Sequence, residues 1–307
     1  MEETQKIKSL ESTLKSLDTE EFIDLHFYRP IGYQWALFFK RLNISPNTIT
    51  VAAIIIGSAA GICFYFSNLK INFLGIILLV WANSYDSADG QLARMTGKST
   101  PLGRILDGLC GTIWFVVIYI AICFRLTPSW GGWIWMLAII TGYFHRKQTA
   151  MADYYRNVHL FFLKGESGSE LSNSVSLKEN YKKTAWTYNF IFKLFDFFYL
   201  RYTREQESWA PNFLQMMKII REKYREKIPE WLRTSFREKS LPLMKYTNML
   251  SFNTRVIVLF IALIINYPWL YFIFELTVLN SMLVYMIIKH ESICSEFKKR
   301  IETNNDD

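Results

Sequence analysis

Six long runs of apolar residues constrain the fold of this chain of 307 residues more than any other feature. A helix needs about 20 mainly apolar residues to cross the hydrocarbon layer of a membrane, and most of these runs approach that length. The sequence therefore predicts an all-α integral membrane protein with six transmembrane helices. The runs are residues 49–66, 71–85, 106–124, 133–151, 256–267 and 270–288, the last two divided only by Pro268 and Trp269.

Basic residues predict how these spans are oriented. Lysine and arginine accumulate on the cytoplasmic side of membrane helices, and here they favour the side that holds both chain ends. That bias accounts for the net charge of +8 without a nucleic-acid partner. We expect an active site on the cytoplasmic face, of the inner membrane if the source is bacterial. The residues on that side are Lys40, Arg41, Arg94, Lys98, Arg104, Arg146, Lys147 and Lys298 to Arg300, against Lys70 and Arg125 opposite.

Polar segments between and beside the runs suggest four regions. Residues 1–44 combine a polar tail with a helix whose aromatic and basic residues suit the membrane interface. Residues 45–155 hold the first four spans, and residues 251–307 hold the last two and a C-terminal tail. Residues 156–250 form a cytosolic insert of amphipathic helices, which could lie on the anionic leaflet or pack against the bundle or a second subunit.

The four cysteines show no paired or metal-type spacing. Three of them lie in or near apolar runs, which favours reduced packing residues over disulfides or a metal site. They are Cys63, Cys110, Cys123 and Cys294.

A charged segment between the second and third runs, residues 86–111, is the expected functional site. Charge at a membrane boundary is costly unless it is paired, hydrated or bound to an ion. Asp86 and Asp89 share one helix face, and Asp107 can approach them from the start of the next helix. Three oxygen ligands on neighbouring helices suit Mg²⁺, Mn²⁺ or Ca²⁺ rather than a soft metal.

The same segment resembles the signature of the CDP-alcohol phosphotransferase family, integral membrane enzymes that make phospholipids. The signature reads D-x2-D-G-x2-A-R, about eight residues, then G-x3-D-x3-D. Seven of its eight positions match, and Gly111 stands where the last aspartate is expected. The matching residues are Asp86, Asp89, Gly90, Ala93, Arg94, Gly103 and Asp107.

The resemblance implies roles for the matching residues. Asp86, Asp89 and Asp107 would bind Mg²⁺ or Mn²⁺, which neutralises the diphosphate of a CDP-linked donor. Small side chains would allow close approach of the phosphate and of the helices, and basic side chains would contact phosphate or cytidine. The small residues are Gly90 and Ala93, and the basic ones are Arg94, Lys98 and Arg104. An interfacial, snorkelling role for Arg94 remains open.

Residues 45–50 are also similar to a segment of the family that lines the nucleotide pocket, which implies donor contacts for Asn47 and Thr50. An ordinary helix start, with Ser45 as the cap and Pro46 in the first turn, explains the same pattern. Both interpretations stay open from the sequence.

Gly111 is the one departure from the signature, and it removes the family's expected general base. His145 and Asp153, eight residues apart with Thr149 between them, share a helix face and could take over the proton. Alternatively, the acceptor's own phosphate or the metal activates the hydroxyl, or the protein binds a nucleotide lipid without turning it over. His145 could also simply cap the fourth span, and Asp153 could pair with Arg156.

We therefore predict a transferase that moves a phosphorylated alcohol or phosphatidyl group from a CDP-linked lipid or alcohol donor to a hydroxyl acceptor in phospholipid or phosphosphingolipid synthesis. Acceptors under consideration are inositol, inositol phosphate, an amino alcohol or a ceramide-like lipid, and the family implies a homodimer. A silent CDP-lipid-binding protein is an alternative. A transporter is disfavoured because the charges cluster at one end of the spans, and only Glu275 lies well inside one.

Overall fold

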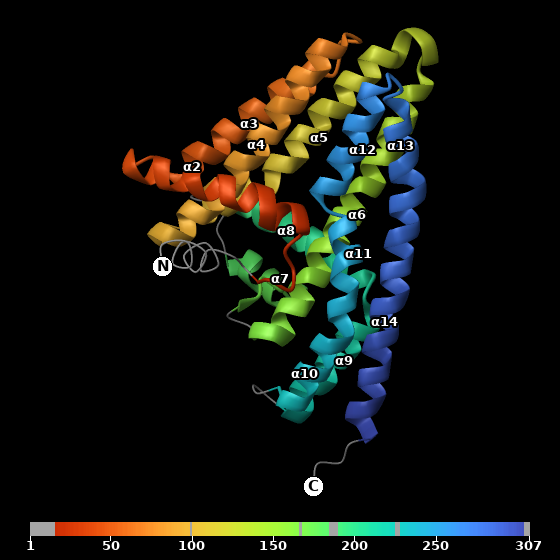
Figure 1. Ribbon diagram of the computed structural model, residues 1–307. Coiled ribbons are helices and arrows are strands. Elements are labelled where there is room, and N and C mark those ends of the chain that lie inside the picture. The colour runs from red at the N-terminus through yellow and green to blue at the C-terminus, as the bar shows by residue number, and fades with distance from the viewer. Residues whose placement is uncertain (1–15, 99, 166–167, 184–189, 225–227, 304–307) are drawn as a thin grey trace. The chain divides into compact units, whose positions relative to one another are not determined.

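Every regular element in the described part of the chain is a helix, as the sequence predicts. The computed structural model describes residues 16–98, 100–165, 168–183, 190–224 and 228–303 (Figure 1). Most of the expected polar tail, residues 1–15, lies outside them. The chain divides into two compact units, Met1–His145 with Phe252–Thr277 and Arg146–Ser251 with Val278–Asp307. We describe each unit by itself.

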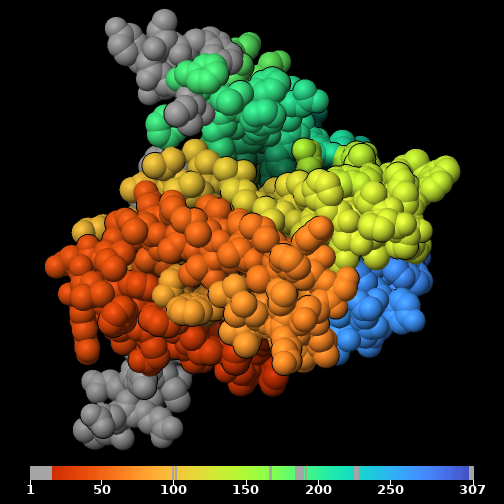
Figure 2. Space-filling model, turned by 90° about the horizontal axis from the view of Figure 1, so that it is seen from above, coloured from red at the N-terminus to blue at the C-terminus, as the bar shows by residue number. Residues whose placement is uncertain are grey.

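The first unit contains the helices of the charged segment. Its core is formed by α3, α4 and α5, which pack side by side, with α2 against α4. In Figure 2 the red to orange surface of α2, α3 and α4 is continuous. The elements are η1 (Asp24–Tyr28), α2 (Arg29–Arg41), α3 (Pro46–Cys63), α4 (Leu69–Thr96), α5 (Pro101–Trp130), the first part of α6 (Trp133–Lys164), α12 (Phe252–Ile264) and α13 (Trp269–Phe274).

Close helix packing next to the charged segment depends on a small residue. A Cβ atom added at Gly57 of α3 would lie 2.2 Å from the indole of Trp114 on α5. That indole, which is buried, donates a hydrogen bond to the carbonyl of Ala53 at 3.0 Å. The two helices can therefore approach only because position 57 has no side chain.

The predicted breaks between helices are confirmed. Ser45 caps α3, its hydroxyl accepting from the amide of Thr48 at 3.2 Å, and Pro46 is the first helical residue. Between α12 and α13, Asn266 adopts a left-handed φ of 61° just before Pro268. Since proline cannot continue a helix on its N-terminal side, the fifth and sixth apolar runs form separate helices.

The second unit holds the predicted insert, which is helical. Among the described residues of the insert, α9 ends at Tyr224 and α10 begins at Glu230, with Pro229 directly before it. Its elements are the second part of α6, α7 (Ser174–Lys183), α8 (Phe190–Ser208), α9 (Pro211–Tyr224), α10 (Glu230–Ser240), η3 (Leu241–Leu243), α11 (Met244–Met249) and α14 (Asn280–Thr303). A π-helical turn, η4 (Glu275–Leu279), precedes α14.

Four helical segments among the described residues are long and apolar enough to cross a membrane, so the count of six is not confirmed. The second and fourth predicted runs do form helices, α4 and α6. Polar residues such as Asn72 and Asn83 in α4, and Arg146 and Lys147 in α6, lower the apolar character of these two. The four segments are Pro46–Cys63, Leu102–Trp130, Glu230–Ile264 and Trp269–Thr303.

Candidate active site

The three predicted metal ligands meet in the first unit. A carboxylate oxygen from each of Asp86, Asp89 and Asp107 lies within 4.8 Å of the others. Asp86 and Asp89 come from α4 and Asp107 from α5, so the prediction that two neighbouring helices contribute is correct. Asp89 is buried and Asp107 exposed. The cluster is thus open on the side of α5.

Repulsion among these carboxylates has few compensating contacts. Asp86 Oδ1 is buried and has no hydrogen-bond partner among the described residues. A buried carboxylate oxygen without a donor fits a place for a cation or a water molecule. Thr50 of α3 donates its hydroxyl to Asp89, and the buried Cys110 thiol interacts with Asp86. These two neighbours hold the carboxylates in place but add no positive charge.

Asn47 and Gly103 meet at the start of α5. The Asn47 amide donates to the Thr100 hydroxyl at 3.3 Å, and that hydroxyl caps α5 by accepting from the amide of Gly103 at 3.0 Å. A Cβ atom at position 103 would lie 2.6 Å from Asn47 Oδ1. The glycine of the signature is therefore needed here for contact with α3.

The remaining residues of the predicted donor site lie in the last two turns of α4, in the connection after α4 and in the first turn of α5. Arg94, Lys98 and Arg104 are exposed, which leaves their charges accessible to an anion. A Cβ atom at Gly90 would come within 3.5 Å of the Arg94 guanidinium. Ala93 is partly buried on α4.

Space is open at the position of the missing aspartate. A Cβ atom built at Gly111 has no heavy atom within 4 Å, and the same is true of Gly108. Gly111 lies one helical turn, about 6 Å, beyond Asp107 on α5. A side chain or a substrate group could therefore occupy this place.

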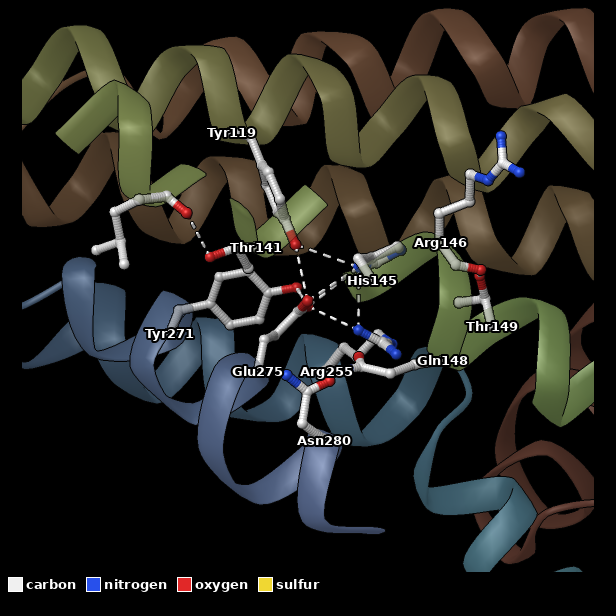
Figure 3. Close-up of polar contacts among 11 residues, drawn as sticks. Tyr119, Thr141, His145, Arg146, Gln148, Thr149, Arg255, Tyr271, Glu275 and Asn280 are labelled. Atoms are coloured by element: carbon white, nitrogen blue, oxygen red, sulfur yellow. Dashed lines mark hydrogen bonds and ion pairs between the residues drawn. The ribbon is translucent and has the colours of Figure 1, made fainter. Parts of the chain in front are cut away.

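His145 lies in a buried polar cluster of the first unit (Figure 3). Its Nδ1 is 3.1 Å from Glu275 Oε1, 3.2 Å from the Tyr119 hydroxyl and 3.0 Å from a guanidinium nitrogen of Arg255. The hydroxyls of Tyr119 and Tyr271 both donate to Glu275. The His145 side chain is 14% exposed, and the Glu275 side chain has no exposed surface.

Asp153 belongs to the second unit, so it is not part of this cluster. Asn157 donates to its Oδ1 at 3.1 Å, and the Tyr202 hydroxyl to its Oδ2 at 3.5 Å. Burial and then the Asp153 carboxylate raise the pKa of Tyr202, which therefore keeps its proton as a donor. Arg156 donates to Asn248 and Ser251.

The partners of His145 were not predicted. Arg255 lies one residue before the fifth predicted apolar run, yet it is a fully buried residue of α12. Glu275 was noted only as an isolated charge. An acidic and a basic residue at the edges of the last two apolar runs could have suggested this pairing, because unpaired charges are rarely buried.

The fold and the site define a helical integral membrane protein with a carboxylate cluster suited to a hard divalent cation. Residues 43–153 match the family model of the CDP-alcohol phosphatidyltransferases. This matched segment contains the whole signature, so the resemblance that the sequence analysis states is confirmed for residues 43–153.

Two relatives have informative names. A bifunctional IPC transferase and DIPP synthase of Aquifex aeolicus is 31% identical over 33% of this chain and 22% of its own length. An archaetidylinositol phosphate synthase of Pyrococcus horikoshii is 42% identical over 22% of this chain and 34% of its own. The matches thus span about a third or less of these relatives. No solved structure matches the chain.

Proposed function

We propose that this protein is a membrane transferase that moves a phosphatidyl or similar phosphorylated alcohol group from a CDP-linked donor to a hydroxyl acceptor. The observation that carries the proposal is the meeting of Asp86, Asp89 and Asp107 within 4.8 Å, inside the segment that matches the family. An inositol or inositol phosphate acceptor is favoured, because one relative is named an archaetidylinositol phosphate synthase and the exposed residues Arg94, Lys98 and Arg104 make the edge of the site basic.

The carboxylate cluster fits a divalent metal, Mg²⁺ or Mn²⁺. The donor set is all oxygen, and the partnerless Asp86 Oδ1 lies in it. A cation bound there would neutralise the donor diphosphate and stabilise the charge that develops as CMP leaves. Asp86, Asp89 and Asp107 would hold it.

Other residues of the first unit would position the donor. Arg94, Lys98 and Arg104 are exposed cations that suit phosphate or cytidine. Asn47 is already placed against the start of α5, while Thr50 is used to orient Asp89. Gly90 and Ala93 would leave room for a phosphate beside α4.

We assign His145 as the general base in place of the missing aspartate. This role requires the neutral tautomer in which Nδ1–H donates to Glu275, because Nε2 is then the basic nitrogen; the tautomer in which Nδ1 accepts from Arg255 would leave Nε2 protonated. The ring centre of His145 is 4.5 Å from that of Phe115 on α5. Phe115 lies about two helical turns, or about 12 Å, from Asp107 along α5, so a similar distance separates His145 from the aspartate cluster. A polyol acceptor in the open space at Gly111 would bridge this separation, its hydroxyls or a water carrying the proton.

Asp153 is the second candidate for the base, with the Tyr202 and Asn157 contacts that orient it. A ceramide-like acceptor, and a silent protein that only binds a CDP-lipid, remain the alternative functions. We also propose a homodimer, a cytoplasmic position for the site and the division of the chain into four regions.

Release of CMP by the purified full-length protein tests the function. We would supply CDP-diacylglycerol and other CDP-linked donors with Mg²⁺ or Mn²⁺, and offer inositol, inositol phosphate, amino alcohols and ceramide as acceptors. Acceptor-dependent CMP release that chelation abolishes and that is absent in Asp86→Ala supports the transferase. Tight CDP-lipid binding with no release for any pair would instead support the silent binding protein.

A further inference from the structure

A second group of metal-binding side chains lies in the second unit, on α14. His290, Glu291 and Cys294 each offer a ligand atom, and these atoms lie within 4.8 Å of one another. All three residues are buried, with exposed fractions of 2%, 9% and 0%. The histidine and the cysteine are four residues apart, the spacing that puts two ligands on one face of a helix.

The separations of the atoms fit coordination by a single ion. His290 Nδ1 is 3.7 Å from Cys294 Sγ and 3.8 Å from Glu291 Oε1. Tetrahedral zinc with bonds of about 2.0–2.3 Å sets its nitrogen and sulfur ligands about 3.5 Å apart, and nitrogen and oxygen slightly less. The two separations from His290 Nδ1 would need to shorten by only a few tenths of an ångström, and the Glu291 and Cys294 ligand atoms lie within 4.8 Å of each other.

Glu291 is held in a suitable orientation by α9. Its Oε2 accepts from the backbone amide of Asn212 at 2.6 Å, and its Oε1 from that of Phe213 at 3.4 Å. A carboxylate has about four acceptor sites, so a longer contact to one oxygen leaves capacity for a metal. Hydrogen bonds from the surroundings to a ligating carboxylate are typical of metal sites.

Two buried polar atoms beside the group have no hydrogen-bond partner among the described residues. They are His290 Nε2 and the hydroxyl of Tyr155, whose ring centre is 4.3 Å from that of His290. Of the two, the Tyr155 hydroxyl fits a place for water or an ion, whereas Nε2 lies across the imidazole ring from the Nδ1 that faces Cys294 and Glu291. Asp86, in the first carboxylate cluster, has the same feature.

We propose that His290, Glu291 and Cys294 bind a borderline divalent metal such as Zn²⁺, which fastens α14 to the start of α9. Mixed nitrogen, sulfur and oxygen donors suit such an ion and not the Mg²⁺ class. Water, hydrogen-bonded to the Tyr155 hydroxyl, would fill the fourth position. Binding releases the thiol proton of Cys294, so the ion is held as a thiolate complex. This site is independent of the proposed transferase.

Cobalt substitution of the full-length protein in detergent tests this site, because a thiolate–Co²⁺ bond gives a charge-transfer absorption that carboxylates cannot give. We would use the Asp86→Ala background, to weaken binding at the first cluster, and measure Co²⁺ stoichiometry together with the absorption. We expect one Co²⁺ per chain with the charge-transfer band, displaced by Zn²⁺.

Matched variants locate the band. Cys294→Ser should remove it, and His290→Gln should weaken Co²⁺ binding at least about tenfold. Cys123→Ser removes a different buried thiol, on α5, and should leave the band unchanged. A folded parent protein without the band overturns the proposal whatever the variants do, and so does a band that persists in Cys294→Ser or disappears in Cys123→Ser. In that case Glu291 serves only as the cap of α9.

Discussion

Arg255 and Glu275 form an ion pair of 2.8 Å in which neither side chain has any exposed surface. The pair joins α12 to η4 within the first unit, and His145 and two tyrosines complete its hydrogen bonds. A charge in such surroundings is tolerated only with its partner present. The ion pair therefore links the apolar helices of this unit at one position. Its contacts with Nδ1 of His145 also restrict the position of the imidazole ring.

Removing one partner of this pair should be more damaging than removing both. Glu275→Gln leaves Arg255 buried and uncompensated, and we expect a loss of about 3–5 kcal/mol in unfolding free energy. The double variant Glu275→Gln with Arg255→Met should recover much of the loss. Denaturation in detergent measures both, with Thr277→Val, at an exposed position of η4, as the control. Equal destabilisation in the single and double variants would contradict this account of the pair.

Thr50 should matter through Asp89 rather than through the fold. Thr50→Val keeps the shape of the side chain but removes the hydroxyl that donates to Asp89. Partners that orient a metal ligand are typically worth 10- to 100-fold in metal affinity or activity, roughly, and we expect that loss in the Mn²⁺ dependence of CMP release. Thr48→Val, an exposed position two residues away on α3, is the matched control. An unchanged Mn²⁺ dependence in Thr50→Val would exclude this role.

The two glycines at the start of α5 should respond in opposite ways to alanine. Gly103→Ala puts a Cβ atom 2.6 Å from Asn47 Oδ1, so it must displace Asn47 from Thr100. Gly108→Ala meets nothing within 4 Å and should stabilise the helix by about 0.5–1 kcal/mol. Thermal denaturation compares them, and donor KM reports whether the Asn47 position matters for binding. Gly103→Ala with wild-type stability and KM would show that the contact is dispensable.

Positions 111 and 145 can be tested as alternative positions of the general base. We expect His145→Gln to lower kcat by about 10²–10⁴, the usual contribution of a general base. Because the space at Gly111 is open, Gly111→Asp should fold normally and place a carboxylate where the family has one.

Rescue provides the decisive comparison. In the His145→Gln background, Gly111→Asp should restore a large part of kcat, and the pH dependence should shift toward that of a carboxylate. Asp153→Asn should have little effect if His145 is the base. Full activity in His145→Gln, together with inactivity in Asp153→Asn, would move the role to Asp153.

Local patterns in the sequence determined the helical class of this protein and the three aspartates of its candidate metal site. Asp86 and Asp89 are three residues apart, so any helix brings them to one face, and Asp107 follows one short connection later. The breaks at Pro46 and Pro268 are equally local, since they follow from backbone geometry. The count of six spans is not confirmed, because polar residues within α4 and α6 lower the hydropathy of these two helices.

Only the tertiary structure decided which distant residues meet. Glu275 is separated from His145 by 130 residues and from Tyr119 by 156, and no spacing rule connects them. Glu291 likewise meets the backbone amides of Asn212 and Phe213, 79 and 78 residues away, only because α14 packs against α9. Contacts of this kind depend on how the helices pack against one another, and the periodicity of a sequence does not specify that packing. The residues that share one helix face, in contrast, follow directly from the repeat of 3.6 residues per turn.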